Sequence, residues 1–467
     1  MSKFDASVIG SGPGGYVAAI RCAQLGMKTA IIERYPTLGG TCLNVGCIPS
    51  KALLDSSEHY HNALKHFGKH GIETDGLSLN WPSMLARKDE VVSQTCTGVE
   101  YLMKKNEIEV FHGNGAFLSS QSIQITRDDG TQIQIESDKV IIATGSKPSS
   151  IPGVEIDKQR IITSTEALKL KEVPKSLLVI GGGIIGLELG SVYSRLGSEV
   201  QVVEYLDCLI PSMDGSLSKE MLRTLKKQGI KFFLSHAVQE VKSSQNKVLI
   251  SALNKKEEKV EFEADYCLVA VGRHPYTEGL NLEAAGLKVD ERGRVPVDEN
   301  LQTTVQGIYA IGDVVKGAML AHKAEEEGVF VAETMAGEKP HMNYRNIPSV
   351  LYTWPEAAGV GYTEEELISE ERDYKSGSFP FRALGRARAA METDGLVKIL
   401  ADPVTDEILG IHMMGARVAD LIAEAVVALE FRASTEDLAR ISHAHPTFAE
   451  AVKEAALDAT AKRPLHL

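Results

Sequence analysis

The chain has 467 residues, of which 43% are hydrophobic and 24% are charged, a composition typical of a globular protein with about three or four domains. The formal charge of −13, from 63 acidic and 50 basic residues, argues against a general nucleic-acid-binding protein, because such proteins are usually basic. Six cysteines are too few for a disulfide scaffold, and no apolar run reaches the roughly 18 residues of a membrane-spanning helix.

A buried strand is predicted at residues 4–9, almost directly after the N-terminus. This start leaves no room for a signal or transit peptide. We therefore expect a reducing intracellular compartment, the cytoplasm of a bacterium rather than an organelle, in which a working disulfide would be catalytic.

The predicted strand leads into a glycine-rich turn, Gly10-x-Gly12-x-x-Gly15, then a helix at about 13–25 and a second strand ending in Glu33. In a dinucleotide-binding turn the first glycine permits the tight turn, the second lets the pyrophosphate approach the helix N-terminus, and the third packs the helix against the strand. The carboxylate that ends the second strand can accept hydrogen bonds from ribose hydroxyls.

The same arrangement occurs a second time. A strand at 176–180 precedes Gly181-x-Gly183-x-x-Gly186, and a helix separates this turn from a strand that ends in Glu204. A lone glycine turn can occur by chance, but the acid follows the third glycine by 18 residues in both copies, which predicts two dinucleotide sites. The three residues after Glu204 include no basic side chain, which favours NAD over NADP.

Two cysteines, Cys42 and Cys47, lie between the first glycine turn and a predicted helical stretch at about 50–105. Their spacing exceeds that of thioredoxin-type and zinc-knuckle pairs, but one helical turn can still bring the sulfurs together. Pro49 suits the first turn of a helix that begins just after Cys47, and a helix N-terminus favours the thiolate. The alternative is a pair of buried, inert thiols. The remaining four are interpreted as ordinary thiols: Cys22, Cys96, Cys208 and Cys267.

The rest of the chain alternates between strands and helices. An apolar strand that ends in glycine is predicted at 140–145, and the same pattern occurs at 266–272. Each strand is expected to close one nucleotide-binding unit. A hairpin is predicted around Asp129-Gly130. Later segments are predicted as a buried strand, a helix, three strands and two C-terminal helices, at about 307–313, 320–335, 350–353, 396–400, 408–413, 419–431 and 448–461.

Together these motifs resemble class I of the pyridine nucleotide–disulfide oxidoreductases over essentially the whole chain. The segment from Gly39 to Lys51 is similar to the redox-active signature of that family. Residues 321–328 are most similar to the family members that oxidise dihydrolipoamide. The other matching segments are Ala143-Thr144-Gly145, Gly312-Asp313, and His443 to Thr447 with Glu450.

The resemblance implies an α/β fold with two Rossmann-like dinucleotide-binding domains, for FAD and then NAD, a central domain that completes the FAD site, and a C-terminal α+β dimerisation domain. The corresponding boundaries are 1–150, 151–276, 277–345 and 346–467. Each subunit of a homodimer would bind one FAD tightly but non-covalently.

By the same resemblance, Cys42 exchanges with the substrate and Cys47 faces the flavin. Lys51 lies near the flavin and pairs with Glu188. His445, supplied by the partner subunit and oriented by Glu450, is the acid–base group. The residues expected to contact the two cofactors are Gly10, Gly12, Gly14, Gly15, Glu33, Gly40, Thr41, Lys51, Gly115, Ala143, Thr144, Gly145, Gly181, Gly183, Gly186, Glu188, Glu204, Gly272, Gly312, Asp313 and Ala321.

The C-terminal motif has a simpler interpretation without the resemblance. Thr447 and Glu450 fit a capping box at the start of the last helix, and a histidine before proline is usually a loop residue. Both interpretations can hold, because a capping glutamate can lie near a histidine at the same helix entrance. His443 and His445 have no third candidate ligand nearby, so no metal site is expected.

The implied activity is the oxidation of protein-bound dihydrolipoamide to lipoamide by NAD+, with the acyltransferase core of 2-oxo-acid dehydrogenase complexes as partner. A glutathione-type NAD(P)H-dependent disulfide reductase is the nearest rival, but basic residues after Glu204 would be expected in such an enzyme. Mercuric reductase would carry an extra C-terminal cysteine pair. A non-catalytic flavin-bearing scaffold would tolerate loss of Cys42, Cys47 or His445, and the chain retains all three.

Overall fold

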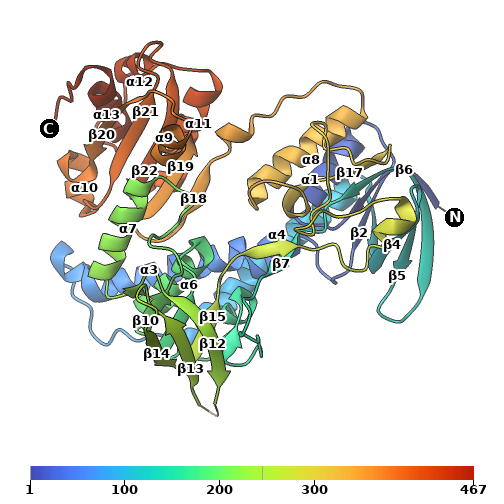
Figure 1. The fold of residues 1–467 in the computed structure, drawn as a ribbon, viewed down its shortest axis with the longest axis horizontal. Helices are drawn as coiled ribbons and strands as arrows, with labels where there is room; N and C mark the ends of the chain where they lie inside the picture. Colours follow the sequence, from blue (N-terminus) through green and yellow to red (C-terminus); the bar gives the residue numbers. More distant parts are fainter. Residues whose placement is uncertain (1, 245, 467) are drawn as a thin grey trace. The chain divides into compact units, whose positions relative to one another are not determined.

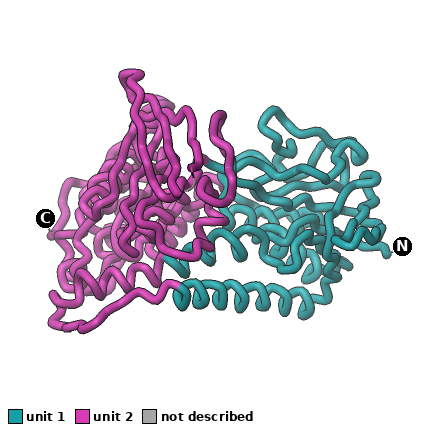
Figure 2. The backbone as a smooth tube through the Cα atoms, turned by 90° about the horizontal axis from the view of Figure 1, so that it is seen from below, with its two compact units in different colours: residues 1–53, 82–149, 272–342 teal, residues 54–81, 150–271, 343–467 magenta. Residues whose placement is uncertain are grey.

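The computed structural model describes residues 2–244 and 246–466, and the chain divides into two compact units (Figure 2). Unit 1 contains residues 1–53, 82–149 and 272–342, whereas unit 2 contains 54–81, 150–271 and 343–467. The predicted mixed α/β fold is confirmed. The division into four domains stays a prediction.

Unit 1 is built on a seven-stranded sheet in the order β3–β2–β1–β6–β5–β4, with β17 also paired to β6. The strands β3, β2, β1, β6 and β17 are parallel, and β4, β5 and β6 form an antiparallel meander. The predicted hairpin is confirmed, because Ile125 pairs with Ile133. The strands are β1 (Ser2–Ile9), β2 (Thr29–Glu33), β3 (Glu109–His112), β4 (Asn114–Ser119), β5 (Ser122–Thr126), β6 (Gln132–Ile142) and β17 (Ile308–Ala310).

Two helices of unit 1, α1 (Pro13–Gln24) and α8 (Ala321–Met335), lie side by side (Figure 1). Glycines permit this close approach, since a Cβ on Gly14 would lie 2.7 Å from the Ala324 carbonyl oxygen. The remaining elements of this unit are α2 (Gly40–Val45), the paired strands β7 (Ser146–Pro148) and β16 (Arg273–Pro275), and the short helices η2 (Leu282–Ala285) and η3 (Gly312–Val314).

The helical stretch predicted at 50–105 is interrupted, which corrects that prediction. It contains α3 (Cys47–Lys65), η1 (Phe67–His70) and α4 (Trp81–Lys105), with non-helical chain before α4. Gly71 and Gly76 adopt φ values of +74° and +67°, a left-handed conformation that ends helices and that glycine adopts without steric cost.

The first part of unit 2 contains a five-stranded parallel sheet in the order β11–β10–β9–β15–β8 and a three-stranded antiparallel sheet, β12–β13–β14. The strands are β8 (Ile161–Ile162), β9 (Ser176–Ile180), β10 (Glu199–Val203), β11 (Lys231–Phe233), β12 (Ala237–Ser243), β13 (Val248–Leu253), β14 (Lys259–Ala264) and β15 (Tyr266–Val269). The helices are α5 (Ser164–Ala167), α6 (Ile184–Arg195) and α7 (Gly215–Lys227).

The C-terminal part of unit 2 is a five-stranded antiparallel sheet in the order β18–β19–β22–β21–β20. Helix α11 (Val418–Glu430) packs on β19 and β22, and α13 (Glu450–Ala461) packs on β20 and β21. Phe381 and Phe448 stack in the hydrophobic core of this part of unit 2, with ring centroids 5.7 Å apart. The other elements are β18 (Ser349–Leu351), β19 (Glu356–Gly361), β20 (Lys375–Pro380), β21 (Leu396–Ala401), β22 (Ile408–Gly415), α9 (Glu364–Ser369), α10 (Gly385–Ala390), α12 (Thr435–Arg440), η4 (Tyr344–Asn346) and η5 (Phe381–Ala383).

Candidate active site

The first glycine turn leaves open space beside its middle glycine only. Gly10 has a φ of +104°, and a Cβ there would lie 2.4 Å from the Ala143 carbonyl oxygen. A Cβ on Gly15 would lie 2.0 Å from the Gly10 carbonyl oxygen, whereas one on Gly12 would meet no atom within 4 Å. Gly10 and Gly15 are therefore required by the protein's own packing, and Gly12 leaves room for a ligand to approach the backbone.

The second turn repeats this geometry in unit 2. Gly181 has a φ of +109°, with the Ala270 carbonyl oxygen 2.4 Å from its absent Cβ. A Cβ on Gly186 would lie 2.4 Å from the Gly181 carbonyl oxygen, and Gly183 again has no atom within 4 Å. Two segments about 170 residues apart thus build the same cradle, as the spacing argument predicts.

Each cradle lies at a helix N-terminus without a side-chain cap. Gly12 is the N-cap residue of α1 and Gly183 is the N-cap residue of α6, and neither can supply a capping oxygen. The first amide groups of both helices therefore remain donors to a ligand, and the helix dipole favours an anionic one. A dinucleotide pyrophosphate has the charge and the acceptor oxygens that such a site requires.

The acid at the end of each second strand holds the glycine turn in place. Glu33, only 5% exposed, accepts hydrogen bonds from the Ser11 amide at 3.0 Å and the Ser11 hydroxyl at 2.6 Å. Glu204 accepts one from the Gly182 amide at 2.5 Å. Ser11 and Gly182 occupy the same position, directly after the first glycine, and sequence reasoning missed both. The ribose contacts of the two acids stay predictions, although each carboxylate oxygen keeps acceptor capacity.

The two cysteines lie on consecutive short helical segments. Cys42 is in α2, Gly46 interrupts the helix, and Cys47 is the first residue of α3. The predicted helix start near Cys47 is therefore confirmed. A Cβ on Gly40 would lie 2.6 Å from the Gly12 Cα atom, so α2 packs directly on the first glycine turn.

Asn44 fixes this segment and has no counterpart in the sequence-based prediction. Its amide group donates to the carbonyl oxygens of Leu38 at 3.0 Å and Gly40 at 2.9 Å. Its side-chain oxygen accepts from the Thr37 hydroxyl at 2.8 Å. These bonds tie the residue between the two cysteines to the chain that precedes Cys42.

The Cys42 and Cys47 thiols are hydrogen-bonded to one another and lie near disulfide distance. This bond raises the pKa of the Cys42 thiol, and burial raises it further. Two sulfurs this close form a coupled pair, in which the protonation of one thiol changes that of the other. The pair can cycle between a dithiol and a disulfide.

The two further segments that the resemblance assigns to the flavin also meet within unit 1. Ser146, directly after Gly145, donates its hydroxyl hydrogen to the Asp313 carboxylate. The Arg273 Nε atom donates to the Ser146 hydroxyl at 2.7 Å, and another Arg273 nitrogen donates to the Ser146 carbonyl at 2.7 Å. Neither Ser146 nor Arg273 was predicted.

A buried ion pair supports the Gly312 turn. Lys323 and Glu327 lie one helical turn apart on α8 with their charged atoms 2.7 Å apart. Glu327 also accepts a hydrogen bond of 2.6 Å from the Gly312 amide. Ala321 begins this helix.

Several predicted contacts stay predictions. Lys51 lies in the early part of α3 in unit 1. Glu188, 3% exposed on α6 in unit 2, accepts a hydrogen bond from the Tyr352 amide at 3.1 Å. The predicted pairing of Glu188 with Lys51 is untested. Gly115 lies on β4, where a Cβ would meet the Ile32 side chain at 3.2 Å. The cofactor roles of Gly14, Thr41, Ala143, Thr144 and Gly272 are likewise untested.

His445 and Glu450 form a pair at the entrance to α13. The His445 Nδ1 atom lies 2.8 Å from Glu450 Oε1, and the Thr447 amide donates to Glu450 Oε2 at 2.9 Å. Burial alone would raise the pKa of Glu450, but these two bonds hold it below the usual value. The His445 side chain is 76% exposed, so its other ring nitrogen is accessible.

The capping box predicted at this entrance is only half formed. Glu450 reaches back to the Thr447 amide, but α13 begins at Glu450 and Ala449 is the N-cap residue. The Thr447 hydroxyl donates instead to the Ala444 carbonyl at 2.7 Å. The predicted helix start at residue 448 is therefore two residues early.

The neighbouring His443 has its own carboxylate partner, which the sequence did not indicate. Its Nε2 atom lies 2.7 Å from Glu424 Oε1, and its Nδ1 atom lies 3.1 Å from the Ile441 carbonyl oxygen. The hydrogen bond with Glu424 raises the pKa of His443 above the usual value. In the part of the chain that the structure describes, no group of three or more His, Cys, Asp or Glu side chains is arranged to hold a metal ion.

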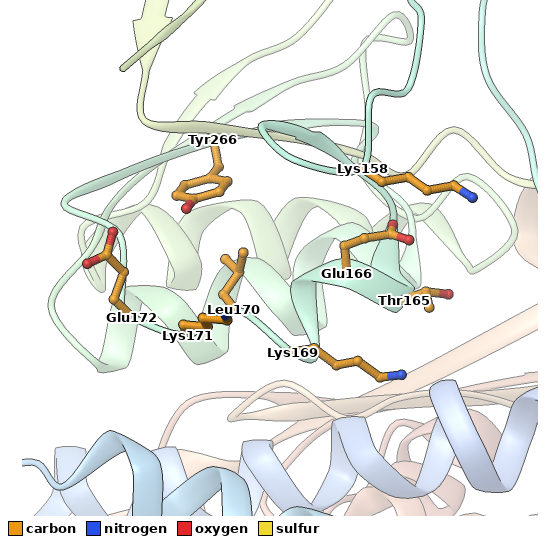
Figure 3. A pocket seen from close by; sticks show the side chains of 8 residues that line it. All are labelled: Lys158, Thr165, Glu166, Lys169, Leu170, Lys171, Glu172 and Tyr266. Atoms are coloured by element: carbon orange, nitrogen blue, oxygen red, sulfur yellow. The ribbon is translucent and has the colours of Figure 1, made fainter. Parts of the chain in front are cut away.

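A pocket elsewhere in unit 2 lies outside this arrangement (Figure 3). It lies beside α5, and none of the predicted site residues lines it. Its lining mixes three lysines with two glutamates and contains neither cysteine nor histidine. The lining residues are Lys158, Thr165, Glu166, Lys169, Leu170, Lys171, Glu172 and Tyr266. Within residues 2–244 and 246–466, every helix is too short or too polar to cross a membrane.

Two family models match the chain. Residues 4–328 match the pyridine nucleotide-disulphide oxidoreductase model, and residues 347–456 match the dimerisation domain of that family. Dihydrolipoyl dehydrogenase 2 of Arabidopsis thaliana mitochondria is 50% identical over 464 residues, covering 99% of this chain and 91% of the relative. Dihydrolipoyl dehydrogenase of Cupriavidus necator is 48% identical over 476 residues, covering 100% of both.

Solved structures show the same fold. The flavoprotein disulfide reductase RclA of Escherichia coli, in a Cu(II) complex, aligns with a TM-score of 0.87 and 28% identity, covering 98% of this chain and 99% of its own. LpdA of Mycobacterium tuberculosis aligns with a TM-score of 0.89 and 25% identity over 98% and 99%.

Proposed function

The chain belongs to the pyridine nucleotide–disulphide oxidoreductase family, and from that premise we propose that it is a dihydrolipoyl dehydrogenase, which oxidises protein-bound dihydrolipoamide to lipoamide with NAD+. One observation carries the proposal. The Cys42–Cys47 pair is packed on one dinucleotide-type cradle, and the chain contains a second cradle of the same geometry.

The cofactor assignment is part of the proposal. Family membership implies a flavin and a pyridine nucleotide. We assign FAD to the cradle around Gly12, with Glu33 and Asp313 as further contacts, and NAD to the cradle around Gly183 with Glu204. When bound, the FAD would accept an electron pair from the reduced cysteines and pass it on as hydride to NAD+.

The thiol chemistry can be written on the chain's own residues. His445 takes a proton from one thiol of dihydrolipoamide, and the resulting thiolate attacks the Cys42 sulfur of the Cys42–Cys47 disulfide, whose S–S bond breaks with Cys47 leaving as thiolate. The second substrate thiol then attacks the substrate sulfur of the mixed disulfide, and its proton passes to Cys42, which leaves as a thiol. Lipoamide is released, one proton is held by His445 and one by Cys42, and two electrons have passed from the substrate to the enzyme cysteine pair.

The pair of His445 and Glu450 suits the proton transfer. When the Nδ1 hydrogen points at Glu450 Oε1, the lone pair of the ring is on the exposed Nε2 atom, which is the nitrogen that can take a proton. We propose that His445 acts in the site of the partner subunit of a homodimer. Its place within the matched dimerisation domain, residues 347–456, supports this.

A substrate comparison tests the activity. NAD-linked oxidation of dihydrolipoamide is measured beside NADPH-linked reduction of glutathione disulfide, with protein reconstituted with FAD. Dihydrolipoamide activity supports the proposal. Glutathione disulfide reduction without dihydrolipoamide activity would replace it by the rival disulfide reductase.

Subunit mixing tests the shared site. The variants Cys47→Ser and His445→Gln are each expected to be inactive, and hybrid dimers should regain activity at the site that has both native residues. Verified hybrid dimers without activity would contradict a site shared between subunits. We further propose a cytoplasmic location. We also propose docking on the acyltransferase core of a 2-oxo-acid dehydrogenase complex, and co-purification with that core would test this docking.

A further inference from the structure

We propose that Lys398, on β21 of the C-terminal sheet, is a positioning residue that holds the second glycine turn in place through Asp214 and the segment 209–214. Lys398 would act on the cradle that the proposed function assigns to NAD, so the inference rests on that function. It concerns a buried ion pair that no step above uses.

The segment 209–214 packs directly on the second glycine turn. The Ile210 amide donates to the Gly182 carbonyl oxygen at 3.0 Å. A Cβ on Gly182 would lie 2.6 Å from the Leu209 Cδ2 atom, and both Leu209 and Ile210 are fully buried. The Gly182 amide is bonded to Glu204 at the end of β10, so the amide and the carbonyl oxygen of this glycine are both held.

Ile210 adopts a backbone conformation that needs support from its surroundings. Its φ is +41°, in a region that β-branched residues rarely enter because the side chain crowds the backbone. Such a conformation persists only where neighbouring contacts impose it. The Ile210 carbonyl oxygen accepts from the Met213 amide at 2.9 Å, while its amide is held by Gly182. The fit of the segment against the glycine turn therefore depends on how its far end is anchored.

Asp214 anchors the far end of the segment to two other elements. Its Oδ1 atom accepts from the Ser216 amide at 3.0 Å and so caps α7. The Lys398 ammonium donates to both Asp214 oxygens, at 2.9 and 3.0 Å, and to Glu364 Oε2 at 2.8 Å. Asp214 is 0% exposed and Lys398 is 8% exposed. Loss of either partner would therefore leave the other as a buried charge without compensation.

The connection from Lys398 to the glycine turn consists of hydrogen bonds and close packing. Helix α7 begins directly after Asp214 and packs against β22 of the C-terminal sheet (Figure 1). On this helix the buried Ser218 hydroxyl accepts from the Leu209 amide at 3.1 Å. Removing the Lys398 ammonium would release Asp214, loosen the start of α7 and the segment 209–214, and allow Gly182 to move.

Hydrogen exchange tests this support in the absence of any added nucleotide. Peptide mass spectrometry compares the native protein with Lys398→Met. Exchange should be about tenfold faster or more in the peptides that contain Gly182 and Ile210, and unchanged in the peptide that contains Gly12, because only the second turn loses its anchor. An unchanged rate at Gly182 would overturn the proposal.

The matched control removes another lysine–aspartate pair of the same sheet. Lys375, on β20, lies 2.6 Å from Asp406, and this pair has no contact with the segment 209–214 in the connection described above. Lys375→Met should leave exchange at Gly182 at the native rate. An equal increase in the control would show that any loosening of the sheet has this effect, and it would overturn the proposal.

A double variant separates positioning from simple loss of stability. Lys398→Met leaves the Asp214 charge buried and should lower the Tm. Combining it with Asp214→Asn removes that charge and keeps a side-chain oxygen for the α7 cap. The Tm should then recover most of the way while exchange at Gly182 stays fast. Recovery of both would attribute the effect to the uncompensated charge and would overturn the proposal.

Binding of ADP-ribose measures the consequence for the cradle. This probe has the pyrophosphate of NAD but accepts no hydride, so titration calorimetry of the FAD-loaded protein reports binding alone. The Kd should rise about tenfold in Lys398→Met and in the double variant, a usual size for coupling between distant groups, and stay unchanged in Lys375→Met. An unchanged Kd in the double variant would overturn the proposal. A native protein that neither binds ADP-ribose nor reduces NAD+ would refute the proposed function instead, and the exchange rates would still decide whether Lys398 holds the turn.

Discussion

Glu450 lies 2.8 Å from His445 Nδ1 through one carboxylate oxygen and is held by the Thr447 amide through the other. The Thr447 amide thus fixes the orientation of the carboxylate that contacts the imidazole. A histidine whose Nδ1 is held by a carboxylate presents Nε2 for proton transfer and stabilises its own positive charge. The half-formed capping box and the proposed acid–base pair are therefore one structure.

Replacing Glu450 by Gln should lower kcat for dihydrolipoamide oxidation by about 10- to 100-fold, because the amide can keep the Thr447 contact but no longer stabilises the imidazolium. His445→Gln should cost more, about 10²- to 10⁴-fold. Steady-state kinetics check both values. The control is Glu436→Gln, a surface carboxylate paired with arginines; unchanged kcat in Glu450→Gln would remove Glu450 from the proton-transfer pair.

The His443–Glu424 pair should stabilise the protein more at low pH than at high pH. The folded pKa of His443 is raised, so its contribution is fully present below the unfolded value of about 6.5 and is lost as the pH rises through the folded value. The Tm of His443→Gln should therefore fall below that of the native protein by about 1–3 °C at pH 5.5 and by less at pH 9. Equal differences at the two pH values would show that the charge of His443 contributes nothing.

The glycine turns should separate folding from cofactor binding. Gly12→Ala introduces a Cβ that meets no protein atom, so the fold should survive while FAD is lost on purification. Gly15→Ala would place a Cβ 2.0 Å from the Gly10 carbonyl oxygen and should lower the Tm of the protein stripped of FAD. Flavin absorbance and thermal unfolding measure the two effects.

The second turn supplies the matched comparison. Gly183→Ala, which also meets no protein atom, should leave the flavin content intact and raise KM for NAD+ about tenfold or more, equivalent to roughly 1.4 kcal/mol. Loss of flavin in Gly183→Ala, or its retention at native affinity in Gly12→Ala, would contradict the assignment of the two cradles.

The choice of NAD over NADP should depend on the Glu204 charge. Glu204→Gln keeps an acceptor for the Gly182 amide but removes the charge that repels a 2′-phosphate. The ratio of kcat/KM for NAD+ over NADP+ should fall about tenfold. Glu199→Gln, at the exposed start of the same strand and paired with Lys231, serves as control. An unchanged ratio in Glu204→Gln would place the discrimination elsewhere.

Local pattern was enough to predict much of this fold. Both glycine turns, the helices after them and the hairpin between Ile125 and Ile133 follow from spacing and turn residues, because these features are decided by neighbours in the chain. The helical stretch predicted at 50–105 is interrupted before α4, where Gly71 and Gly76 adopt left-handed conformations and glycine breaks helices.

The supporting contacts of the site depend on tertiary structure. Glu327 reaches the Gly312 amide and Arg273 reaches Ser146, 127 residues earlier, and no local pattern marks either residue as a partner. The pairing of His443 with Glu424, 19 residues apart, likewise required the packing of α11.

The central claim is that electrons pass from dihydrolipoamide to NAD+ through the Cys42–Cys47 pair, and single-thiol replacement tests it most directly. Dihydrolipoamide-dependent NADH formation is measured for FAD-loaded Cys42→Ser, Cys47→Ser and the control Cys208→Ser, which replaces a half-buried thiol outside the pair. The account predicts that each of the first two variants loses activity by about 10³-fold or more while the control keeps it. Near-native NADH formation by either Cys42→Ser or Cys47→Ser would contradict it.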